Sequence, residues 1–213
     1  MAAGGRVEIP VVVNDRAAHR PVVEKLSLQA DAGPGLSAMA AIRLTPEPNE
    51  VVARTSWPIV PATMASAWTE TISGNGVARL SAVGGELICE AEPLSHDRWF
   101  YPRLKLDGAN RPPPGAQGVA FTFRLIEGSG TFRTLITETN GSTYVIDWLT
   151  QPKRGIAVEA MTLFEDGTFG EGWSKPDPNH CFDPDQSAEL QIGCNCDSAR
   201  VKFAISNVRW IGF

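Results

Sequence analysis

The 213-residue chain lacks any apolar run that approaches the ~20 residues needed to cross a bilayer. It also lacks a run rich in lysine and arginine, and its formal net charge is −5 with a pI of about 5.3. We therefore expect it to bind neither a membrane surface nor nucleic acid. Histidines number only three and are scattered, and no G-x-S-x-G elbow is present, which argues against serine-based nucleophilic catalysis.

A secretion signal is also missing from the start of the sequence. Met1–Arg6 has no apolar core of the kind that a signal peptide requires. We expect the chain to be a piece of a larger protein, whose signal lies in the part that is not present.

Cysteine is scarce, with four in the chain: Cys89, Cys181, Cys194 and Cys196. A disulfide from Cys181 to either Cys194 or Cys196 would close a short loop and would imply an oxidising, extracellular compartment. The C-x-C spacing with His180 nearby also allows a Cys3His metal site, although zinc sites more often use C-x2-C pairs. Free buried thiols are the third interpretation.

Glycine and proline are abundant, at 20 and 16 residues, and they separate many short segments with alternating apolar residues. This composition is typical of strands joined by turns, and it predicts an all-β antiparallel sandwich. We expect strands at 77–80, 86–91, 98–106, 119–126, 131–138, 144–149, 156–164, 188–192 and 200–210. Of these, 156–164 would also tolerate a helix.

The first third of the chain has a strand pattern of its own, with about four candidate strands between residues 7 and 60. Its start loosely resembles the "V-P-V-x-V-x-N" opening of immunoglobulin-like appended domains. The proline-rich stretch 57–61 reads as an extended connector, because each proline restricts the residue before it. We place the domain boundary at about residue 65, with an immunoglobulin-like or strand-rich segment at 1–65 and a β-domain at 66–213.

The stretch 98–106 alternates with period two between two kinds of side chain. One side is suited to a packed core and consists of Phe100, Pro102, Leu104 and Leu106. The other consists of Trp99, Tyr101, Arg103 and Lys105. Two aromatic rings followed by two cations are unusual for a solvated face and indicate a binding surface. The alternative is that this face is covered, for example by residues 1–65.

The C-terminal third has the most distinctive motifs: F-G-E-G-W-S-K-P-D-P-N at 169–179, F-D-P-D-Q at 182–186, L-Q-I-G at 190–193 and V-K-F-A-I-S-N-V-R-W at 201–210. Together they resemble the tail of jelly-roll carbohydrate-binding modules with the galactose-binding-like fold. The resemblance covers about 68–213. It implies a jelly-roll sandwich appended to a secreted glycoside hydrolase, with a polysaccharide as ligand and often a structural calcium. Ser206 stands where the family pattern has Asp, which weakens the calcium expectation.

Sugar rings present C–H patches that stack on aromatic planes and hydroxyls that bond to polar side chains. The candidate binding residues follow from this chemistry. They are Trp99, Tyr101, Trp148 and Trp173 as stacking planes, Arg103 and Arg124 as donors, and Glu138 and Asp147 as acceptors. Arg103 and Arg124 would be neighbours if 98–106 pairs with 119–126. Trp148 shares a side with Ile146, so it can also belong to the core.

Two other functions remain open at this stage. A catalytic jelly roll would need two carboxyl groups about 5–10 Å apart. Glu138 and Asp147, flanking one hairpin, are the first candidates, and Glu159 and Glu90 are others. A purely structural accessory domain would need no sugar affinity. We expect no catalytic residue, and therefore an accessory module rather than an enzyme.

Overall fold

The computed structural model describes the backbone of residues 25–31, 37–43, 53–148 and 151–213, and the side chains of the last two ranges. The chain divides into two compact units, 1–52 and 53–213. In the first unit, strand β1 (Lys25–Asp31) pairs antiparallel with β2 (Ser37–Arg43), with Leu28 opposite Ala40. The other parts of the strand pattern predicted before residue 53 lie outside the described residues, and the immunoglobulin-like assignment of this unit stays a prediction.

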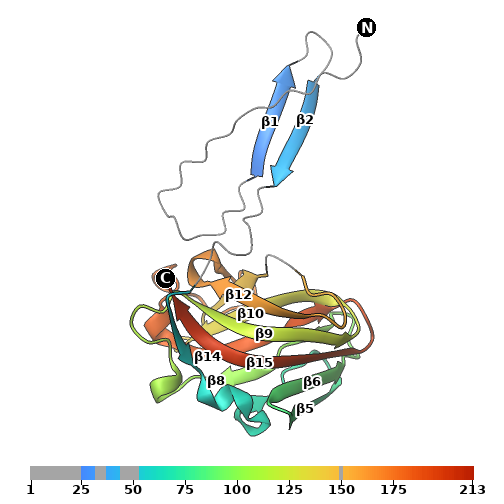
Figure 1. The fold of residues 1–213 in the computed structure, drawn as a ribbon, viewed down its shortest axis with the longest axis vertical. Coiled ribbons are helices and arrows are strands. Elements are labelled where there is room, and N and C mark those ends of the chain that lie inside the picture. The colour runs from blue at the N-terminus through green and yellow to red at the C-terminus, as the bar shows by residue number, and fades with distance from the viewer. Residues whose placement is uncertain (1–24, 32–36, 44–52, 149–150) are drawn as a thin grey trace. The chain divides into compact units, whose positions relative to one another are not determined.

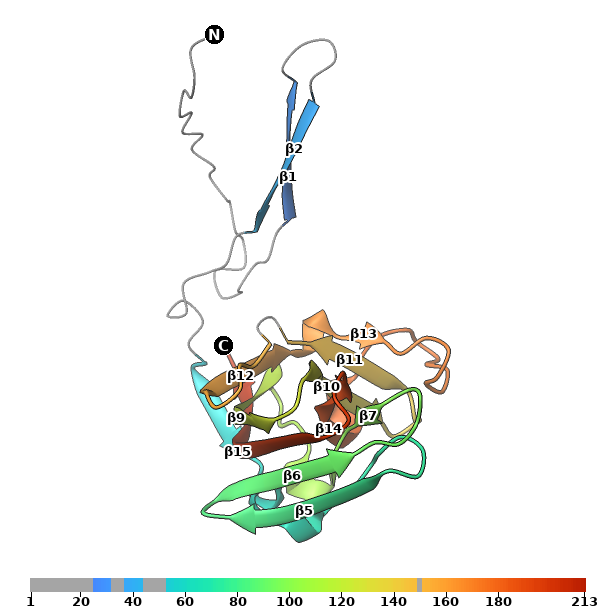
Figure 2. The same cartoon turned by 90° about the vertical axis from the view of Figure 1, so that its right-hand side faces the viewer.

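The second unit is an antiparallel sandwich of two sheets, as predicted (Figures 1 and 2). The seven-stranded sheet has the order β13-β11-β10-β14-β8-β4, and β7 also pairs with β14. Its strands are β4 (Trp68–Thr69), β7 (Trp99–Phe100), β8 (Arg103–Lys105), β10 (Gly130–Glu138), β11 (Thr143–Asp147), β13 (Thr168–Phe169) and β14 (Ser187–Cys196).

The six-stranded sheet has the order β12-β9-β15-β6-β5, and β3 also pairs with β15. Its strands are β3 (Thr55–Pro58), β5 (Val77–Val83), β6 (Glu86–Glu92), β9 (Gly118–Glu127), β12 (Ala157–Leu163) and β15 (Val201–Gly212). The ambiguous segment at 156–164 is a strand, β12, which pairs with β9. Its alternating residues line the core beside β9. Short 3-10 turns occupy Val60–Thr63, Ala65–Ala67, Gly108–Asn110, Phe164–Asp166 and Pro184–Gln186.

The boundary between the units lies nearer to residue 52 than to the expected residue 65. Thr55–Pro58 pairs with the end of β15, and Ile59 and Ala62 are buried in the core of the sandwich. The two prolines at 58 and 61 thus do not connect two domains. Pro58 ends an edge strand, where a missing backbone N–H costs no ladder hydrogen bond, and Pro61 lies in the first turn of the 3-10 helix Val60–Thr63.

The core lies between the two sheets and is rich in aromatic rings. Phe123 of β9 packs against Phe203 of β15 at 5.2 Å and against Trp148 at 4.8 Å between ring centroids. Phe132 of β10 closes the group, 5.6 Å from Trp148. Because every second residue of each strand points inward, the alternation in the sequence places these rings together. Such pairs contribute about 0.5–1.5 kcal/mol each beyond their buried area.

The turn between β5 and β6 shows how the sequence sets the register of this sheet. Gly84 and Gly85 both have positive φ, 59° and 83°, as a two-residue type I′ turn requires. The pairing then runs from Val83 opposite Glu86 to Val77 opposite Glu92.

Among the residues that the structure describes, no helix is long and apolar enough to cross a membrane.

Candidate functional site

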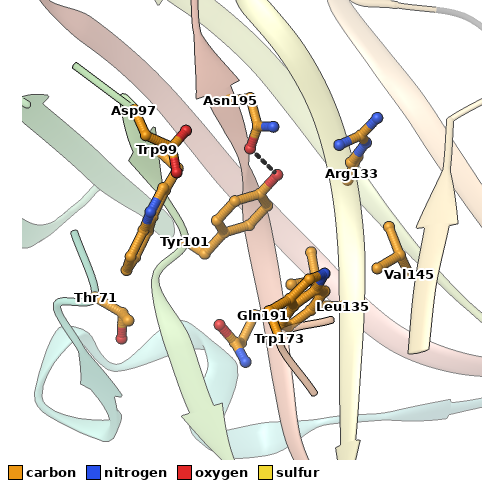
Figure 3. Close-up of a pocket in the computed structure, with 10 residues that line it drawn as sticks. All are labelled: Thr71, Asp97, Trp99, Tyr101, Arg133, Leu135, Val145, Trp173, Gln191 and Asn195. Carbon is orange, nitrogen blue, oxygen red and sulfur yellow. Dashed lines mark hydrogen bonds between the residues drawn. The ribbon is translucent and has the colours of Figure 1, made fainter. Parts of the chain in front are cut away.

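The aromatic cleft lies on the outer face of the seven-stranded sheet and has a volume of about 470 Å³. We give this name to the hollow lined by Thr71, Asp97, Trp99, Tyr101, Arg133, Leu135, Val145, Trp173, Gln191 and Asn195 (Figure 3). It crosses β7, β14, β10 and β11 in turn. Three steps between neighbouring strands correspond to roughly 14 Å.

Trp99 and Tyr101 are brought to the cleft by an interruption in the predicted strand at 98–106. The structure divides that stretch into β7 and β8, which both pair with β14 on either side of Gly193. At Gly193 the chain at Phe100–Tyr101 approaches so closely that a β-carbon would collide with the Phe100 carbonyl oxygen. This close approach, which only glycine permits, lets the Tyr101 ring lie across the sheet.

The side preference predicted for this stretch is confirmed. Phe100, Leu104 and Leu106 are at most 1% exposed and belong to the core. Trp99 and Tyr101 face the cleft, and their ring centroids are 6.4 Å apart at an angle of 38°. They form two inclined planes in the same cleft.

Tyr101 forms the middle of the cleft and is only 6% exposed. Its hydroxyl donates to Asn195 Oδ1 at 2.9 Å. Burial raises the pKa of Tyr101 well above its ordinary value, so the phenol stays protonated and uncharged. The ring therefore presents an apolar surface at any ordinary pH.

Trp173 faces the cleft from the loop after β13, on the other side of Tyr101 from Trp99 (Figure 3). Its indole lies on Gly170, whose missing side chain leaves the space that the ring fills. Two bonds fix this loop to β11: Gly170 N–H donates to the Thr143 carbonyl at 2.9 Å, and Thr143 N–H donates to Ser174 Oγ at 2.7 Å. Trp173 is 59% exposed although its loop is anchored.

Arg133 supplies the cation of the cleft, and sequence reasoning missed it. Its Nε donates to Asp147 Oδ1 at 2.6 Å, across the β10–β11 pair. The Asp147 carboxylate thus holds the guanidinium in place at the rim of the cleft. The signal that could have found Arg133 is its position opposite Asp147 in the hairpin that the Asn140-Gly141 turn predicts.

Asn195, Gln191, Asp97 and Leu135 were also missed. Asn195 and Gln191 alternate outward along β14, the strand that was predicted only over 188–192. Their side chains reach the cleft because the C-x-C cysteines and Leu190 point inward. Val145 of β11 also lines the cleft.

Arg124 does not reach the cleft, because 98–106 does not pair with 119–126, the condition for Arg124 to lie beside Arg103. Strand β9 pairs with β12 and β15 in the other sheet, while β7 and β8 pair with β14. On that other face Arg124 forms an ion pair with Glu86. Arg103 lies on the same sheet as the cleft, opposite the cleft residue Gln191. Its Nη1 forms an ion pair with Glu189 Oε1 at 3.3 Å.

Two further candidates are parts of the folded interior. Trp148 is 6% exposed, packs in the aromatic core and donates from Nε1 to Thr134 Oγ1 at 3.0 Å. Glu138 is 2% exposed and accepts bonds from Ser142 Oγ at 2.6 Å and from the Asp183 N–H at 2.6 Å. Neither side chain lines the cleft.

All four cysteines are free thiols in the structure, so the expected disulfide from Cys181 is not formed. Cys181 lies on an exposed loop, whereas Cys194 and Cys196 point from β14 into the core. Nor do the described residues bring together three or more His, Cys, Asp or Glu side chains that could hold a metal ion. The Cys3His set is therefore not assembled.

The comparisons with solved structures find β-sandwiches of similar fold in carbohydrate-binding modules. A family 11 carbohydrate-binding module from Clostridium thermocellum, solved with a β-1,3-1,4-mixed-linked tetrasaccharide, matches with a TM-score of 0.57 at 14% identity, over 68% of this chain and 89% of that one. The family 11 module of a cellulosomal cellulase of the same organism matches with a TM-score of 0.57 at 12% identity, over 69% and 88%.

An agarase matches with a TM-score of 0.53 at 13% identity, over 75% of this chain and 25% of the agarase. No protein-family model and no curated protein matches the sequence. At these identities the likeness is one of fold.

Proposed function

We propose that residues 53–213 are a non-catalytic carbohydrate-binding module and that the aromatic cleft is its binding site. The observation that carries this proposal is the arrangement of Trp99, Tyr101 and Trp173 within one open cleft. Rings at both sides and in the middle offer apolar planes to successive sugar units. The polar groups between them, on Asn195 and Arg133, can bond to ring hydroxyls.

The charges of the cleft favour a neutral polysaccharide over an acidic one. Asp97 and Arg133 are the two charged residues of the lining, and Arg133 is paired with Asp147. An extra carboxylate or sulfate on the sugar would therefore meet no uncompensated positive charge. The roughly 14 Å across the four strands is long enough for a few linked sugar rings, so longer oligosaccharides should bind more tightly than a single sugar.

The catalytic alternative loses the pair of carboxylates on which it depended. Glu138 is buried under its own hydrogen bonds, and Asp147 is bound to Arg133. A secreted glycoside hydrolase as parent protein, and the extracellular location that follows, remain parts of the proposal. So does a structural calcium, which a chelator arm in the binding assay tests.

Affinity electrophoresis against a panel of soluble polysaccharides tests the proposal, with mixed-linkage β-glucan, xylan, mannan, agarose and pectin in the gels. We expect retention by at least one neutral polysaccharide and loss of that retention in Trp99→Ala and Trp173→Ala. The loss of one stacked ring corresponds to about 1–3 kcal/mol of binding free energy. No retention on any gel would favour the purely structural role, and release of reducing sugar would favour an enzyme.

A further inference from the structure

A pair of thiols lies directly behind the aromatic cleft, on the core side of strand β14. The Sγ atoms of Cys194 and Cys196 are 3.5 Å apart. Both side chains point to the same side of the strand because the residues are two apart. Cys194 is fully buried, while Cys196, at the end of the strand, retains 8% exposure.

Asn195 connects this pair to the cleft. It lies between the two cysteines, and its side chain points to the opposite face, where Oδ1 accepts the Tyr101 hydroxyl at 2.9 Å. Its backbone is paired with Trp99. Any change in the backbone between the two cysteines must therefore displace a residue that holds the middle of the cleft.

The two thiols differ in acidity in the way that disulfide exchange requires. A hydrogen bond from the Cys194 thiol lowers the pKa of Cys196, in opposition to burial and to the negative charge of Asp197, and Arg98 adds to the lowering. The same bond, together with burial, raises the pKa of Cys194. Cys196 is thus the thiol that ionises first, and it is also the one nearer to solvent.

We propose that Cys194 and Cys196 are a redox-modification site, which a low-molecular-weight disulfide converts to an intrastrand disulfide, and that this bond weakens ligand binding in the cleft. The second half rests on the proposed function. The Cys196 thiolate attacks one sulfur of the small disulfide and releases one thiolate. Cys194 then loses its proton, attacks the Cys196 sulfur and releases the second, so that two protein thiols and one small disulfide give one protein disulfide and two small thiols.

Closing this bond must distort the strand. The sulfurs would approach from 3.5 Å to about 2.05 Å. Two residues of extended strand span about 6.6 Å, near the upper limit of the Cα separations that disulfides allow. The backbone at Asn195 must pucker to shorten this span. A bond under such strain is easily reduced again, which makes the modification reversible.

The chemical half is tested by incubating the protein with glutathione disulfide, or with dithiothreitol as control, and alkylating it after denaturation. We expect the peptide containing residues 194–196 to lose both labelling sites and two hydrogens in mass. Cys181→Ser, which removes the exposed thiol, should give the same result. Full alkylation of Cys194 and Cys196, or glutathione adducts alone, would overturn the proposal.

The coupling to the cleft is tested on the same samples. Oxidation should shift the resonances of the Asn195 side-chain amide and of the Trp99 indole N–H in nuclear magnetic resonance spectra. The same treatment should leave these resonances unchanged in Cys196→Ser. Unshifted resonances in the oxidised protein would refute the coupling whether or not a sugar binds.

With mixed-linkage β-glucan, or the polysaccharide that the screen retains, the oxidised protein should bind about 2- to 10-fold more weakly, the range for one lost hydrogen bond. Equal affinity of both forms would refute the effect on binding. If the reduced protein binds no polysaccharide while the disulfide forms, the proposed function fails and the thiol chemistry stands.

Discussion

The outer faces of the two sheets are built from the same period-two pattern, yet they carry different chemistry. On the six-stranded sheet the charged side chains pair with each other across one or two strand spacings. Its ion pairs are Arg124 with Glu86, Lys202 with Glu90, Arg200 with Glu90 and Glu92, and Arg209 with Glu159. The seven-stranded sheet has the ion pairs Arg133 with Asp147 and Arg103 with Glu189, but there aromatic rings and mostly uncharged side chains line a cleft. The role of an arginine or lysine in binding can therefore be inferred only when the side chains on the neighbouring strands are known.

The largest expected effect separates the tryptophan of the core from that of the cleft. Trp148→Ala should lower the free energy of unfolding by about 3–5 kcal/mol, because it leaves a cavity among packed rings. Trp173→Ala should change it little, because that indole is mostly exposed. Urea unfolding of both variants measures the difference. Equal losses would mean that Trp173 is part of the packed structure rather than an open binding surface.

The next effect concerns the buried carboxylate. Glu138→Gln should destabilise the fold by about 1.5–3 kcal/mol, the range for a hydrogen bond to a charged group, and should leave sugar retention unchanged at temperatures where it is folded. Thermal unfolding and affinity electrophoresis report the two quantities. A stable variant that no longer binds would restore Glu138 to the binding site.

These two contrasts show what the sequence could and could not predict. The sandwich, most of its strands and the stacking side of 98–106 follow from alternation and turn residues. The positions of Trp99 and Tyr101 in the cleft follow from that alternation. The position of Trp173 follows from its polar loop, which offers the indole no core to enter. Arg124 was misassigned because alternation gives the face of a strand but not the sheet to which it belongs. Arg133 could have been found from its place opposite Asp147 in a predictable hairpin, whereas Asn195 acquires its role from long-range pairing, which one sequence does not reveal.

A smaller effect compares the two arginines directly. Arg133→Ala should weaken the binding free energy for the polysaccharide by about 1–3 kcal/mol, because a charged donor is lost from the cleft. Affinity electrophoresis would show this as weaker retention. Arg124→Ala is the matched control on the other sheet and should bind as the parent does. If both variants lose the same retention, the assignment of the site to one face is wrong.

The smallest effect belongs to the ion pairs of the six-stranded sheet. Lys202→Ala removes the 3.1 Å contact to Glu90 and should cost about 0.2–1 kcal/mol of stability, with less loss at high salt. Urea unfolding at low and high ionic strength measures this change. A loss well above 1 kcal/mol would show that the pairs act together as a network.

The segment Phe100–Tyr101 crosses β14 so closely at Gly193 that the position of Tyr101 depends on the absence of a β-carbon at residue 193. Gly193→Ala would force the crossing segment away from β14 while leaving every side chain of the cleft chemically intact. A protein engineer could thus disable the proposed binding site without changing any residue that lines the cleft.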